Sequence, residues 1–132
     1  SNQRLVVPAI WRAIREVGGE ALVGRVSKRV SRALAEHYRK KIRSVNPKQR
    51  LRDYIRLLNE EGALVDAAED NGRLVMHKRS CPFISMLDEN QLICGVDLDM
   101  MSYVVGKPVR RGECRHQGAP CCTFEIAEDN RS

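Results

Sequence analysis

The cysteines are the residues of this chain whose type and placement could do chemistry. The chain has 132 residues and five cysteines, and all five fall after residue 80. They stand at Cys81, Cys94, Cys114, Cys121 and Cys122. Thiolates are the ligands that structural zinc and iron–sulfur clusters prefer. An odd number of cysteines fits poorly with a secreted disulfide framework and favours thiols in a reducing cytoplasm.

Four of these thiols are candidate ligands of one centre, which would hold zinc or an iron–sulfur cluster. The candidate ligands are Cys81, Cys94, Cys114 and Cys122. Their spacing contains no Cys-x-x-Cys knuckle, so tertiary structure would have to assemble the site from a loop, a helix start and two strands. Two readings without metal stay open. The cysteines could be reduced core residues that pack as small apolar side chains, or they could form a reversible disulfide.

The first half of the chain predicts helices. Apolar residues at helical spacing indicate helices over 5–17, 20–43 and about 47–61. The pair Gly18-Gly19 should end the first helix. The pair Asn46-Pro47 should start the third, with Asn as the N-cap and Pro at the first helical position.

The second half predicts two β-hairpins on either side of one helix. Residues 63–79 form the first hairpin, and Asn71-Gly72 is its two-residue turn. This register sets His77 opposite Asp66, which favours a surface pair over a metal role for the histidine. A helix over about 90–105 follows, and Gly106 closes it.

The second hairpin is predicted from 109–114 and 122–126. Cys122, Phe124 and Ile126 alternate along its last strand and should face the core. The neighbouring Cys121 should then point outward. Cys94 falls in the first turn of the preceding helix, where the helix dipole favours a thiolate.

These elements predict an α+β fold in which N-terminal helices pack on an antiparallel sheet of two β-hairpins, with one helix between them. Residues 1–62 would be a helical region for dimerisation and for linkage to a DNA-binding domain that this chain lacks. Residues 63–132 would be the cysteine-containing sensor region, and the two would form one compact domain. The sequence has no apolar run of membrane-spanning length and no secretory signal at its start, so we expect a cytoplasmic protein.

Charge is distributed unevenly along the chain. Residues 1–60 hold 15 Lys and Arg against 5 Asp and Glu, whereas residues 61–132 hold 8 against 12. Such a basic half indicates either a polyanion partner or an ordinary solvated helix face. The candidate nucleic-acid contacts are Arg25, Lys28, Arg29 and Arg32. The sequence has no nucleophile–base arrangement and no phosphate-binding loop, so we do not expect an enzyme.

The segment from residue 47 to about 127 resembles the C-terminal sensor region of ArsR-like winged-helix transcriptional regulators of the SufR type. The matching features are Cys81-Pro82-Phe83, Cys94 with Asp97, Gly106, Val109 with Arg111, and the final run from Gly118 through Cys122 and Phe124 to Ile126. The end of the chain is also similar to small-molecule-binding domains of the four-vinyl-reductase type.

The resemblance implies a metal- or iron–sulfur-responsive sensor domain of a prokaryotic transcriptional regulator. Such regulators bind DNA through a winged helix, and this one would be a homodimer. The alternative is a small-molecule-binding sensor with a structural zinc or with no metal. In that case the pocket would lie between a helix and the sheet, and a small-molecule effector would bind there.

Overall fold

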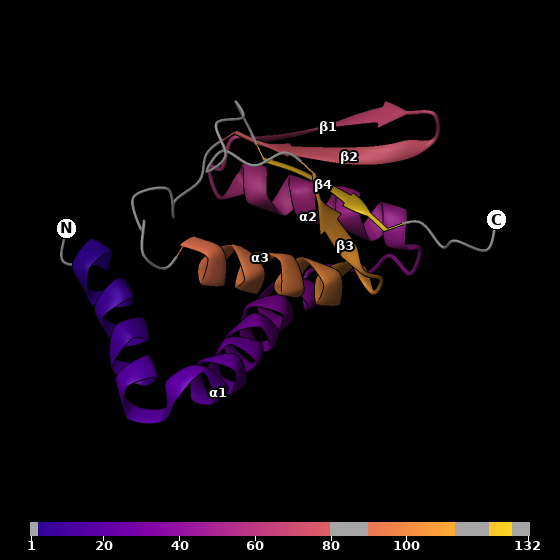
Figure 1. Ribbon diagram of the computed structural model, residues 1–132. Coiled ribbons are helices and arrows are strands. Elements are labelled where there is room, and N and C mark those ends of the chain that lie inside the picture. The colour runs from indigo at the N-terminus through magenta and orange to yellow at the C-terminus, as the bar shows by residue number, and fades with distance from the viewer. Residues whose placement is uncertain (1–2, 80–89, 113–121, 128–132) are drawn as a thin grey trace.

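The computed structural model describes residues 3–79, 90–112 and 122–127. It has the expected α+β class. Its elements are α1 (Gln3–Arg39), α2 (Pro47–Glu60), β1 (Val65–Asp70), β2 (Arg73–Lys78), α3 (Asn90–Val105), β3 (Val109–Arg111) and β4 (Cys122–Ile126). In Figure 1, α3 lies between the second half of α1 and the part of the molecule formed by α2 and the sheet.

The strands form an antiparallel sheet in the order β1-β2-β4-β3. Two hairpins therefore build the sheet, and β2 and β4 join them. In this central pair Met76 lies opposite Phe124, and both side chains are buried in the core. The same core includes Leu51 of α2 and Met101 of α3, so α2 and α3 bury their apolar sides against each other and the sheet.

The start of α2 agrees with the sequence prediction. Pro47 is the first helical residue, and the side-chain oxygen of Asn46 accepts a hydrogen bond from the backbone N–H of Gln49 at 3.1 Å. This bond satisfies one of the N–H groups that a helix start leaves without a partner. At the other end Gly62 has a φ of 92°, which glycine adopts without strain and which ends the helix as predicted.

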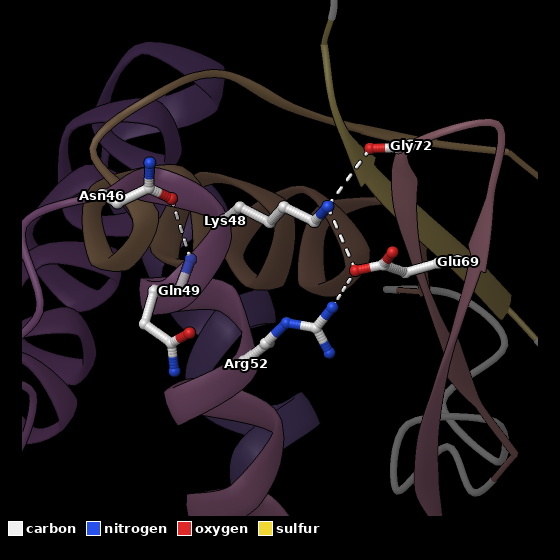
Figure 2. A network of polar contacts seen from close by, with 6 residues as sticks. All are labelled: Asn46, Lys48, Gln49, Arg52, Glu69 and Gly72. Carbon is white, nitrogen blue, oxygen red and sulfur yellow. Dashed lines mark hydrogen bonds and ion pairs between the residues drawn. The ribbon is translucent and has the colours of Figure 1, made fainter.

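The first hairpin also agrees with its prediction, and α2 holds its tip. Asn71 and Gly72 both have positive φ, as a type I′ turn requires. Figure 2 shows how Lys48 reaches this tip from α2: its ammonium group lies 3.0 Å from Glu69 and donates to the carbonyl of Gly72 at 3.3 Å. Arg52 donates to the same carboxylate, and the hydrogen bond from Lys48 is the main cause of a lowered pKa for Glu69.

The two predicted N-terminal helices follow each other across a kink in α1. This element runs from residue 3 to Arg39, and Gly19 has φ 66° and ψ −166°, a non-helical conformation that is essentially restricted to glycine. The glycine pair therefore separates two helical arms, as predicted (Figure 1). The prediction that the second helix extends to residue 43 was wrong, because α1 ends at Arg39.

Apolar residues at helical spacing predict a buried side of α1 that includes Trp11, Val17 and Leu34. Trp11 is buried as predicted, but Val17 and Leu34 are 82% and 43% exposed. The other buried residues in the described part of α1 are Val23, Ser31 and Ala35. Small side chains at the contact let α1 approach α3 closely. Residues such as Ser31 and Ala35 do not stand out in a pattern of large apolar residues, so the sequence does not predict this contact.

No helix in the described part of the chain combines the length and the apolar character that crossing a bilayer requires.

Candidate metal centre and its supporting residues

The structure describes one of the four predicted ligands in full. Cys122 begins β4 and is 5% exposed. Cys94 is the fifth residue of α3, close to the helix start as predicted, but its side chain lies outside the described residues. Cys81 and Cys114 also lie outside them, as does Cys121. Within residues 3–79, 90–112 and 122–127, no three His, Cys, Asp or Glu side chains gather as a metal site would require.

Cys122 stands on the face of the sheet that carries the core. Its predicted alternation with Phe124 is confirmed, since both are buried, whereas Ile126 is only partly buried. Residues that lie directly opposite each other in an antiparallel pair point to the same face. Lys78 is the partner of Cys122 across β2 and β4, so its side chain starts on that face too.

Lys78 forms an ion pair with Asp97 between the sheet and α3. Its ammonium nitrogen lies 3.2 Å from a carboxylate oxygen of Asp97, and the two side chains are only 13% and 14% exposed. Asp97 follows Cys94 by three residues, about one helical turn. The pair therefore joins β2, the strand beside Cys122, to the helix of Cys94.

The same turn of α3 contacts α1 through the next residue. Val96 is buried in a small cluster with Trp11 and Val23, which come from the two arms of the bent helix. Ser31 of α1 also donates a hydrogen bond to the carbonyl oxygen of Val96 at 3.3 Å. Asp97 thus fixes this turn of α3 to the sheet, and Val96 fixes it to α1.

Two tyrosines extend this polar region toward the end of α1. Tyr54 of α2 is fully buried, and its hydroxyl has no hydrogen-bond partner among the described residues. Burial, with a contribution from Asp97, raises the pKa of Tyr54 well above 10.0. Tyr38 meets the Tyr54 ring edge to face at 5.1 Å and donates to Glu61 at 2.9 Å; burial and that hydrogen bond raise its pKa to about 12.

His77 takes the position that the sequence predicted. It lies opposite Asp66, and its Nδ1 is 3.4 Å from a carboxylate oxygen of that residue. Arg79 contacts the same carboxylate at 3.0 Å.

The candidate nucleic-acid contacts lie on the second arm of α1. Their side chains are exposed. Arg32 already has an intramolecular partner, because it donates to the hydroxyl of Tyr103 at 2.9 Å and stacks on that ring at 5.3 Å. Arg25, Lys28 and Arg29 have no ion pair with another described residue.

Lys78 is the functional candidate that sequence reasoning missed. Leu74 and Met76 are buried and alternate along β2, and Lys78 takes the next position on the same face of the strand. A charged residue at such a position is seldom buried without a partner. That break in the alternation was the signal in the sequence.

Comparison with known proteins identifies no relative: no protein-family model, curated protein or solved structure matches the chain.

Proposed function

We propose that the chain is a metal- or iron–sulfur-responsive sensor domain of a prokaryotic, cytoplasmic transcriptional regulator. The observation that carries the proposal is the buried ion pair between Lys78 and Asp97. It holds β2, the strand that pairs with Cys122 in β4, against the helix that begins near Cys94, and this supports a site shared by the sheet and α3. The remaining ligands in this proposal are Cys81 and Cys114.

The chemistry of the surroundings fits a thiolate centre. Zinc or an iron–sulfur cluster would bind deprotonated cysteines and bring net negative charge to the site. Lys78 starts on the same face as Cys122, and its ammonium group, which pairs with Asp97, is largely shielded from water. Mutation of residues that orient the ligands of a metal site typically costs about 10–100-fold in metal affinity. Lys78 and Asp97 are the residues that would have this positioning role.

The signal would pass from the centre to α1 through one turn of α3. Asp97 faces the sheet, while Val96 packs on Trp11 and Val23. A shift of this turn on loss of the metal would therefore change the packing of α1. Trp11 is the single tryptophan of the chain, so its fluorescence reports this contact.

The first arm of α1 supports the homodimer in this proposal. Leu5, Ile10 and Val17 are 72%, 52% and 82% exposed. A helix with so much exposed apolar surface is typical of an interaction site. DNA would be bound by a winged-helix domain joined to this region, and Arg25, Lys28 and Arg29 could add phosphate contacts. The alternative function, a small-molecule sensor with a structural zinc or no metal, is favoured by the cavities beside α3 described in the next subsection.

Cysteine variants test the proposal. We expect Cys81→Ser and Cys122→Ser to lower the metal content of protein purified without oxygen, and to shift the Trp11 emission toward that of chelator-treated wild type. Cys121→Ser is the matched control and should do neither, because that thiol is not a proposed ligand. Unchanged metal content and stability in both Cys81→Ser and Cys122→Ser would refute the proposal.

A further inference from the structure

Two adjoining cavities lie along the contact between α1 and α3. The first has a volume of about 530 Å³, and its walls include Gly24 and Lys28 of α1 and Asp99 of α3. The second has a volume of about 490 Å³ and is lined by Arg39, Lys107 and again Asp99. Because Asp99 belongs to both walls, the two cavities form one groove, which we call the α1–α3 groove.

Two glycines, Gly24 of α1 and Gly95 of α3, line the first part of this groove. Both lie inside helices, where glycine costs about 1 kcal/mol relative to alanine. Neither has the positive φ that would require glycine, and a Cβ added to either would meet no atom within 4 Å. Backbone geometry therefore does not require these glycines, and their lack of a side chain leaves more room in the groove.

The charges that line the groove are not paired with one another. Within the described residues, neither Lys28 nor Asp99 makes an ion pair, and the same holds for Arg39 and Lys107. Some exposed charges elsewhere are paired, as Arg56 is with Glu60 at 3.1 Å, whereas others, such as Arg25 and Arg29, have no ion pair with a described residue. Along the groove the unpaired charges alternate: Lys28 is positive, Asp99 is negative, and Arg39 and Lys107 are positive.

We propose that the α1–α3 groove binds an acidic amino acid or an acidic dipeptide, a ligand that carries an ammonium group between two carboxylates. The ammonium group would donate to Asp99. One carboxylate would meet Lys28, and the other would meet Arg39 and Lys107. Each cavity is of the size that small-molecule sites have, since such pockets span about 300–1,000 Å³.

One serine of the groove fits this ligand. Ser27 donates its hydroxyl hydrogen to the carbonyl oxygen of Gly24 at 2.9 Å. The hydroxyl oxygen of Ser27 thus presents lone pairs, which accept hydrogen bonds from an ammonium group. The site goes beyond the proposed metal response. It would give the domain a second input, since a ligand there ties α1 to α3 through residues that are not among the proposed metal ligands.

Isothermal titration calorimetry on the full chain tests the site with defined probes. The binding probes are L-glutamate and L-glutamyl-L-glutamate, and the matched probes are glutarate, which lacks the ammonium group, and L-glutamine, which lacks one carboxylate. We expect at least one binding probe to bind and both matched probes to bind at least about tenfold more weakly, because each has lost a charge-assisted hydrogen bond.

Variants test whether the probe binds in this groove or elsewhere on the chain. Lys28→Gln and Asp99→Asn should each lower the affinity for the binding probe by about tenfold or more. Arg29→Gln and Glu36→Gln remove the same charges from exposed positions of α1 outside the groove, and should leave affinity unchanged. Circular dichroism verifies folding, and if Asp99→Asn fails to fold, the exposed Lys28→Gln still decides. The proposal is overturned if neither binding probe gives heat, if glutarate binds as tightly as glutamate, or if Lys28→Gln leaves the affinity unchanged.

Discussion

Replacing Lys78 by methionine should destabilise the domain far more than removing an exposed lysine or arginine. The change keeps most of the aliphatic volume but leaves the carboxylate of Asp97 without its cation in a site where that side chain is 14% exposed. Breaking a fully buried ion pair by removing one partner costs about 3–5 kcal/mol. Because both side chains keep some contact with water, we expect about 2–4 kcal/mol.

The assay is guanidinium unfolding followed by far-ultraviolet circular dichroism. For a chain of this length, 1 kcal/mol corresponds to about 3–5 °C in Tm, so the same variant should also melt about 10 °C lower. The matched control is Arg56→Met. That arginine pairs with Glu60 at a similar distance, 3.1 Å, but the two side chains are 56% and 60% exposed. An exposed helical pair contributes about 0.3–0.5 kcal/mol, so the control should stay close to wild type.

A double variant separates an unpaired charge from lost packing. Lys78→Met with Asp97→Leu removes both charges, and replacement of a buried pair by apolar residues is often neutral. We therefore expect it to recover most of the stability that Lys78→Met loses. If Lys78→Met costs no more than Arg56→Met, the ion pair does not hold α3 to the sheet, and the reasoning fails.

Four further variants test individual elements. Gly19→Ala should cost about 1–3 kcal/mol in guanidinium unfolding, because alanine is strained at φ 66° and ψ −166°, whereas Gly24→Ala in the straight part of α1 should be neutral or stabilising by up to about 1 kcal/mol. Asn46→Ala should lower the free energy of unfolding by about 1 kcal/mol through loss of the N-cap bond, and a change within error would contradict that role. The folded pKa of Tyr38, about 12, lies above its ordinary 10.0, so its contribution to stability is complete below pH 10 and is lost as the pH rises through 12. Tyr38→Phe should remove one late tyrosinate step from an alkaline absorbance titration, and a step lost near pH 10 would contradict the assignment.

Local signals predicted the parts of the fold that local chemistry determines. The Asn46-Pro47 start and the Asn71-Gly72 turn were placed correctly, because each depends on the backbone preferences of two adjacent residues. The glycine pair at residues 18–19 correctly marked an interruption. The sequence could not show the angle between the two helical arms, because that angle depends on the packing of Trp11 with Val23 and Val96.

Long-range contacts account for what the sequence did not predict. The buried side of α1 is defined by its fit to α3, and that fit selects small residues such as Ser31 over the larger Leu34. Pairing of β2 with β4 sets Lys78 opposite Cys122, although the two are far apart in the chain. Of the candidate ligands, sequence alternation predicted the buried position of Cys122, and the joint coordination of all four thiols stays a prediction.

Metal analysis of protein purified without oxygen tests the central claim most directly. Iron and zinc would be measured together with the visible absorption spectrum, on wild type and on Cys122→Ser. The account predicts one centre per chain in the wild type, either zinc without colour or iron with a broad visible band, and loss of that metal in the variant. Wild-type protein that contains neither metal, with all five thiols reactive after unfolding, would contradict it.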